Sequence, residues 1–200
     1  TFVLIQHYKG RIPLVHVDLY RLDTAAAVDD LGLEEMADGA VVAIEWAERL
    51  PPSLRELEPK KPLAVGIIGL GAGVVGSWMQ PGDRLVFYEI SPRVVDIARR
   101  EFTFLQDSPA KTEIVLGDGR LSLEREPPRG YDVLGIDAFS GDSIPMHLVT
   151  REAMAIYVKH LKPDGVIVFQ ATNRFVDLLP VIQGLAAEFG LQALNVSDSP

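Results

Sequence analysis

Short apolar runs alternate with amphipathic segments along the chain from residue 62 onward. The apolar runs predict strands, and the segments with apolar residues three or four positions apart predict helices. The predicted strands cover 63–70, 84–90, 112–116, 132–138 and 165–171, and the predicted helices cover 72–79, 92–102, 150–161 and 176–189. Strands that alternate with helices indicate right-handed crossovers and a mostly parallel sheet covered on both faces. We therefore expect an α/β, Rossmann-like fold for residues 62–200.

The first part of the chain has a different pattern. Prolines and charged residues crowd the stretch before residue 62, which predicts a linker at 52–61. Ahead of it, residues 1–51 predict a small, truncated α/β segment. Its expected elements are a hairpin of strands 1–8 and 12–17 about Lys9-Gly10-Arg11, a helix over 24–36 with Thr24 as N-cap, and a strand at 41–46. One more strand is expected to start at 192–196.

Composition narrows the classes of function. The 200 residues are 48% hydrophobic and carry a formal charge of −9, which disfavours direct nucleic-acid binding and suits small cationic substrates. There is no cysteine, and the four histidines show no metal-ligand spacing, so no metal site is expected. No apolar run approaches the length of a membrane span and no signal peptide is visible, which favours a cytoplasmic protein. The chain begins at Thr1 inside a strand-like run, which indicates a fragment or a processed product.

Glycines cluster between the first predicted strand of the second segment and its helix. Gly69, Gly71 and Gly73 are two positions apart, where they let the backbone turn tightly and approach a ligand closely. The amino end of a following helix offers free N–H groups to a phosphate or carboxylate. This loop therefore predicts a nucleotide-binding turn, although a plain tight turn is an alternative.

Acidic residues end the next two strands. Glu89 follows Gly69 by twenty positions, where a carboxylate can accept hydrogen bonds from both ribose hydroxyls. The third strand ends at Gly117-Asp118, and a carboxylate there is well placed to accept from an adenine amino group. Because the carboxyl ends of parallel strands share one edge of a sheet, we expect these residues to converge on one crevice.

A dinucleotide site is a competing interpretation. The run from Gly71 to Gly76 is a literal G-x-G-x-x-G. A dinucleotide site would need an acid about 20 residues after its first glycine, but the residue 20 positions after Gly71 is Ser91. This interpretation also gives Asp118 no role.

The second segment resembles the spermidine-synthase family of the class I methyltransferase fold, over residues 62 to about 195. The likeness rests on the glycine loop, on Glu89, on Gly117-Asp118 and on the runs 102–109, 131–137 and 137–153. It implies an S-adenosylmethionine or decarboxylated S-adenosylmethionine donor and a small amine acceptor such as a polyamine. Asp137 would be the base. The family's second acid lies three residues further on, where this chain has Ser140, so Asp142 is the nearest candidate substrate-binding acid.

The first segment resembles the ATPase subunit of bacterial tRNA threonylcarbamoyladenosine synthesis. The matching runs are 1–4, 16–22, 31–35 and 44–51. The likeness implies that Asp18 lies near magnesium and that Glu45 and Trp46 line the nucleotide site. The family's phosphate-binding loop, G-x-x-x-x-G-K-[ST], occurs nowhere in the chain, which favours a relic site.

Three functions follow from these patterns. The first is a transferase that moves an aminopropyl or methyl group to an amine, with Asp137 as base. The second is a nucleotide-binding module without catalysis, and the third is an ATPase-subunit fragment acting through residues 1–51. Unpaired strand edges would favour a homodimer.

Overall fold

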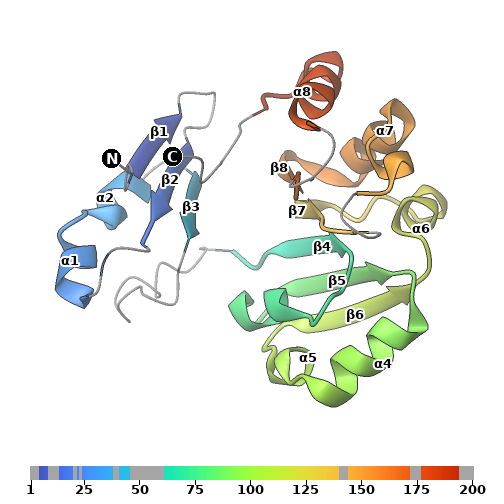
Figure 1. Cartoon of the computed structure of the whole chain (residues 1–200), viewed down its shortest axis with the longest axis horizontal. Coiled ribbons are helices and arrows are strands. Elements are labelled where there is room, and N and C mark those ends of the chain that lie inside the picture. The colour runs from blue at the N-terminus through green and yellow to red at the C-terminus, as the bar shows by residue number, and fades with distance from the viewer. Residues whose placement is uncertain are drawn as a thin grey trace. The chain divides into compact units, whose positions relative to one another are not determined.

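The computed structural model describes residues 5–8, 14–19, 22, 24–37, 41–45, 61–139, 144–171 and 177–193. The chain divides into two compact units, one of Thr1–Lys60 with Gln192–Pro200 and one of Lys61–Leu191. Figure 1 shows the elements of each unit. Among the described residues, no helix has the length and apolar character needed to cross a bilayer.

The described part of the first unit contains a three-stranded sheet and two short helices. The strands lie in the order β1-β2-β3, with β1 antiparallel to β2 and β2 parallel to β3. Their bounds are β1 Ile5–Tyr8, β2 Leu14–Asp18 and β3 Val41–Glu45, and the helices are α1 Ala25–Asp29 and α2 Leu33–Ala37. Buried Val17 and Leu19 of the strand segment pack with Val28 and Leu33 of the helices.

A single helix over 24–36 was therefore a wrong prediction, because the helical segment is interrupted at Gly32, where φ is +65°. Its start was correct, since the Thr24 hydroxyl accepts the Ala27 N–H at 3.2 Å as an N-cap.

The second unit is built on a five-stranded parallel sheet. The strand order is β6-β5-β4-β7-β8, and every pairing is parallel. The bounds are β4 Ala64–Ile68, β5 Arg84–Glu89, β6 Lys111–Leu116, β7 Tyr131–Ile136 and β8 Leu161–Phe169. The expected mostly parallel α/β sheet is confirmed. The sheet runs outward from β4 in both directions, so the strand order reverses between β4 and β7.

Helices cover both faces of this sheet (Figure 1). Their bounds are η2 Val74–Trp78, α4 Pro92–Glu101, α5 Phe104–Asp107, α6 Gly119–Arg125, η3 Met146–Leu148, α7 Arg151–His160 and α8 Leu179–Glu188, where η marks a 3-10 helix. One core contains apolar residues of α6, α7 and α8, and the other contains residues of η2, α4 and α5. Alternate residues of a strand enter alternate cores, as the two-residue period of a strand requires.

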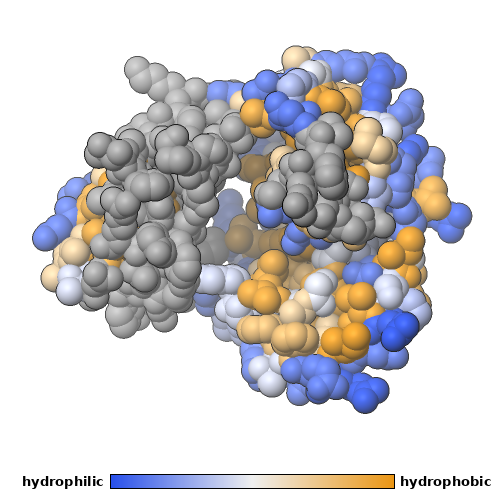
Figure 2. All heavy atoms as spheres, viewed as in Figure 1, coloured by the Kyte–Doolittle hydropathy of each residue, from blue (hydrophilic) through white to orange (hydrophobic). Residues whose placement is uncertain are grey.

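Apolar side chains also reach the surface on the face of η2 and α4. Val74 and Trp78 of η2 are about half exposed, as is Ile97 of α4. Figure 2 shows apolar surface among the polar residues of the second unit.

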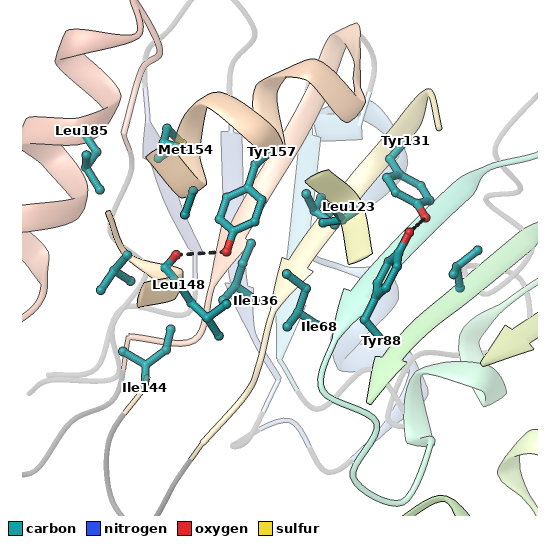
Figure 3. Packing of buried hydrophobic residues seen from close by; sticks show 14 of the residues in the cluster. Ile68, Tyr88, Leu123, Tyr131, Ile136, Ile144, Leu148, Met154, Tyr157 and Leu185 are labelled. Atoms are coloured by element: carbon teal, nitrogen blue, oxygen red, sulfur yellow. Dashed lines mark hydrogen bonds between the residues drawn. The ribbon is translucent and has the colours of Figure 1, made fainter. Parts of the chain in front are cut away.

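Buried hydroxyl groups are satisfied within the first core (Figure 3). The Tyr88 hydroxyl lies 2.8 Å from that of Tyr131 and donates to Glu126 at 2.9 Å. The Tyr157 hydroxyl of α7 donates to the Leu148 carbonyl at 3.0 Å, which fixes η3 on α7. Buried polar groups need such partners because an unpaired one costs free energy.

Candidate nucleoside site at the carboxyl edge of the parallel sheet

The predicted ligand residues lie at the ends of four neighbouring strands. The glycine loop follows β4, Glu89 ends β5, Gly117-Asp118 follows β6 and Asp137 follows β7. Backbone hydrogen bonds continue the ladder beyond the strands. The Gly69 N–H donates to Tyr88 O at 2.9 Å, and the Asp137 N–H donates to Ile68 O at 2.9 Å. The structure therefore brings these residues to one sheet edge, at the reversal of strand order where ligands bind in open α/β sheets.

Glu89 is buried, with 7% of its surface exposed, and its carboxylate is held at both oxygens. Oε2 accepts the Leu70 N–H of the glycine loop at 3.0 Å, and Oε1 accepts the Ser91 N–H at 2.8 Å. A carboxylate has about four lone-pair positions, so each oxygen can take one more donor. This leaves capacity for two ribose hydroxyls while the loop fixes the orientation of the side chain.

The three glycines of the loop have different surroundings. All have positive φ, at +104° for Gly69, +52° for Gly71 and +82° for Gly73. A Cβ on Gly69 would lie 2.2 Å from the Asp137 carbonyl oxygen, whereas a Cβ on Gly71 would meet no atom of the described residues within 4 Å. A Cβ on Gly73 would lie 2.9 Å from the Leu105 side chain. Gly69 and Gly73 therefore allow close packing of the chain on itself, and Gly71 leaves open space beside its backbone.

Ser91 bears on the dinucleotide alternative. Its hydroxyl accepts the Val94 N–H and caps α4. The acid tied to the glycine loop is Glu89, as the nucleoside interpretation expects.

Asp118 makes two contacts that the sequence pattern did not predict. Its Oδ1 accepts the Leu121 N–H at 2.9 Å as the N-cap of α6, and its Oδ2 lies 2.8 Å from Nε2 of His147. Partial burial raises the pKa of the Asp118 carboxyl, but the Leu121 N–H and His147 lower it by more, so the pKa lies below its usual value. Asp118 is therefore an ionised acceptor, and His147 is a neighbour of the site that no local spacing could have identified.

Asp137 differs from the other acids of the site. The residue has an exposed surface, yet the protein around it displaces enough water to raise the pKa of its carboxyl. A raised pKa makes a carboxylate a better proton acceptor near neutral pH. Ser140 and Asp142 lie outside the described residues.

The acids of the first unit also lie at strand ends. Asp18 ends β2 and Glu45 ends β3, and the two residues are direct partners in the parallel pairing. The backbone thus brings them together, while Trp46 lies outside the described residues. Within the described parts of the chain there is no group of three or more acids and histidines that could hold a metal ion.

The first segment matches the family model of threonylcarbamoyl adenosine biosynthesis protein TsaE over residues 1–68. The match therefore extends through the predicted linker into β4. Over 57 residues the chain is 49% identical to the tRNA threonylcarbamoyladenosine biosynthesis protein TsaE of Nostoc sp. The aligned stretch covers 26% of this chain and 35% of that protein.

The second segment resembles other proteins. Over 113 residues the chain is 38% identical to the polyamine aminopropyltransferase of Vibrio vulnificus, which covers 54% of this chain and 37% of that protein. The structure is similar to that of human methyltransferase-like protein 13 in complex with SAH, with a TM-score of 0.56 and 26% identity over 66% of this chain and 65% of that one. The two segments of the chain therefore resemble different families.

These matches confirm both resemblances and the Rossmann-like methyltransferase fold. The chain spans about a third of the length of the two curated relatives, at 35% and 37%.

Proposed function

We propose that the unit Lys61–Leu191 binds an S-adenosylmethionine-type donor and transfers its aminopropyl or methyl group to an amine. The observation that carries this proposal is the carboxylate of Glu89, which is buried at a strand end and tied at 3.0 Å to the glycine loop. The resemblance to aminopropyltransferases and methyltransferases supports the same class of donor.

The nucleoside half of the donor has a defined place in this proposal. The ribose hydroxyls donate to Glu89, and the adenine amino group donates to Asp118 on the adjacent strand. The part of the donor next to the ribose passes Gly71, beside which there is open space. The sulfonium centre then lies toward the end of β7, where Asp137 follows.

The chemical step requires little beyond alignment and removal of a proton. The amine lone pair attacks the carbon bonded to the sulfonium, a C–N bond forms, and the C–S bond breaks. Its electron pair returns to sulfur, which leaves as a neutral thioether. Asp137 accepts the proton that the amine loses, and its carboxylate also attracts a cationic acceptor. A small polyamine fits this charge pattern.

Calorimetric titration tests the proposal. The chain is titrated with S-adenosylmethionine, its decarboxylated form, methylthioadenosine and ATP. We expect binding of the adenosyl thioether and sulfonium ligands, and Glu89→Ala should weaken it by about 1–3 kcal/mol, the cost of losing a buried charged hydrogen bond. Glu124→Ala is the matched control, because Glu124 is an exposed acid of α6 with the same charge.

Each other outcome selects another function. Equal affinity in Glu89→Ala and the wild type would remove the ribose role. Nucleoside binding without alkylation of any amine would favour the non-catalytic module. Binding of ATP alone would overturn the proposal in favour of the Asp18 and Glu45 pair of the TsaE-like segment.

A further inference from the structure

His147 is hydrogen-bonded to the carboxylate of Asp118, the same group that binds the nucleobase in the proposed function. Its Nε2 lies 2.8 Å from Asp118 Oδ2. Because an ionised carboxylate only accepts hydrogen bonds, the His147 N–H donates. The His147 side chain is 46% exposed and that of Asp118 is 19% exposed, so the contact lies at the surface where a ligand can reach it.

The backbone that carries His147 is held in place. The guanidinium of Arg120, the second residue of α6, donates to the His147 carbonyl at 3.2 Å. The next residue, Leu148, accepts the buried Tyr157 hydroxyl at 3.0 Å (Figure 3). The position of the ring beside Asp118 is thus imposed from α6 and α7, and the ring can leave by rotating its side chain without moving η3.

Each carboxylate oxygen of Asp118 already has one hydrogen-bond partner. Its Oδ1 caps α6 by accepting the Leu121 N–H at 2.9 Å. An adenine amino group that donates to Oδ2 therefore approaches the same oxygen as His147.

We propose that His147 competes with the nucleobase for Asp118, and that it thereby sets both the affinity of the site and its preference for bases with an exocyclic amino group. This inference rests on the proposed nucleoside site. In the free protein, the His147 ring is hydrogen-bonded to Oδ2 of the Asp118 carboxylate. A base that brings its own N–H donor displaces the ring and replaces the lost hydrogen bond, whereas a base without an amino group binds with the ring in place.

Three variants separate this role from a structural one. His147→Ala removes the competitor, and His147→Gln keeps a side-chain N–H donor that can still bind Asp118. The matched control is Lys162→Ala, which breaks the pair between Lys162 and Asp132. The side chains of this pair are 40% and 24% exposed, comparable to those of His147 and Asp118. Asp132 lies near the amino end of β7, at the other end of the strand from the site.

The probes are methylthioadenosine and methylthioinosine, which carry an amino group and an oxo group at the same ring position. His147→Ala should bind methylthioadenosine about two- to fivefold more tightly, which lies within the range that a single hydrogen bond contributes. Its affinity for methylthioinosine should not increase, because that base offers no amino donor. His147→Gln and Lys162→Ala should bind both probes as the wild type does.

A direct measurement follows the ring itself. In the wild type, nitrogen NMR of the histidine rings should show His147 changing its environment as methylthioadenosine saturates the protein. The buried ring of His160 is an internal reference, because it donates to Leu123 O and takes no part in the site.

The outcomes distinguish this inference from the proposed function. If the wild type binds methylthioadenosine but His147→Ala binds it equally or less tightly, His147 does not compete and the nucleoside site stands. An unchanged His147 signal at saturation has the same meaning. If neither protein binds the adenosyl probe, both the nucleoside site and the role of His147 are overturned.

Discussion

Alanine substitutions at Gly69 and Gly71 should rank in one order for the loss of stability and in the reverse order for the loss of binding. Both glycines lie in the loop after β4 with positive φ, but their surroundings differ. A Cβ on Gly69 would be 2.2 Å from the Asp137 carbonyl oxygen, which is a backbone atom that the sheet holds in place. A Cβ on Gly71 would meet no atom within 4 Å in the part of the chain that the structure describes.

The expected magnitudes follow from these surroundings. Gly69→Ala combines backbone strain at φ +104° with an overlap that only backbone movement can relieve, at about 1–3 kcal/mol each. Gly71→Ala places a side chain at φ +52°, which costs about 1–2 kcal/mol in the left-handed region. Gly69→Ala should therefore lose more stability than Gly71→Ala, by up to several kcal/mol. The whole free energy of unfolding is about 5–15 kcal/mol for most domains.

Binding should follow the reverse order in the protein that remains folded. The new methyl group of Gly71→Ala projects into the space that the proposed ligand occupies, so this variant should bind methylthioadenosine at least about tenfold more weakly, or about 1.4 kcal/mol. Urea unfolding followed by circular dichroism gives the stabilities, and calorimetry gives the affinities.

Two results would refute the reasoning. Equal stability of the two variants would mean that the Asp137 carbonyl does not approach Gly69 as the structure has it. Wild-type affinity in Gly71→Ala would mean that no ligand passes this glycine.

Three further predictions concern single side chains. Asp137→Asn should bind the donor as the wild type does and transfer no group to an amine, as measured by mass spectrometry of the products; full turnover would remove Asp137 from the mechanism. Burial lowers the pKa of His160 in the folded protein below its ordinary value of about 6.5. The stabilisation by the neutral His160 ring is therefore complete above about pH 7. It is lost as pH falls through the pKa of the unfolded state and then through that of the folded state. Urea unfolding between about pH 7 and pH 5 should therefore show a smaller loss of stability in His160→Phe than in the wild type, and an equal loss would contradict this. Tyr88→Phe removes the hydroxyl shared with Tyr131 and Glu126 and should cost about 1–2 kcal/mol in the same assay, whereas an unchanged midpoint would show that the hydrogen bonds contribute nothing.

Local patterns were sufficient to predict the sheet. The strands β4 and β5 are apolar over most of their length because both faces are covered, and such runs are recognisable without any knowledge of partners. The acid Glu89 could be located for the same reason, since it ends such a run, and Asp118 could be located because it lies two residues after the end of β6.

Elements with weak local signals were missed or misplaced. The helix α6 begins at Gly119, and the sequence analysis gave its N-cap, Asp118, a ligand role alone. The predicted helix at 72–79 is the short 3-10 helix η2, since glycines surround it. The strand β8 begins four residues before its predicted start, because Leu161 already pairs with Tyr131 of β7. The pairing is irregular around Pro163, and a proline at such a position is tolerated only in an outer strand.

Long-range contacts could not be predicted from spacing at all. His147 and Asp118 are 29 residues apart, and they meet because Tyr157 and Arg120 fix the backbone of η3. No periodicity in the sequence encodes that arrangement, which depends on the packing of α6 against α7.

The geometry also explains why one site can resemble both aminopropyltransferases and methyltransferases. The Asp137 N–H donates to Ile68 O, and its carbonyl lies against Gly69, so the proposed base is tied to the strand that leads into the glycine loop. In the proposed function, donor binding and base alignment are therefore coupled through the sheet in the same way for either transferred group. Both reactions break a carbon–sulfonium bond and need only an aligned amine and a proton acceptor. The size and charge of the acceptor must then be selected by side chains that follow Asp137 rather than by the strand ends. Substitutions at the strand ends should accordingly weaken both transfers equally, whereas substitutions beyond Asp137 should change which amine is used.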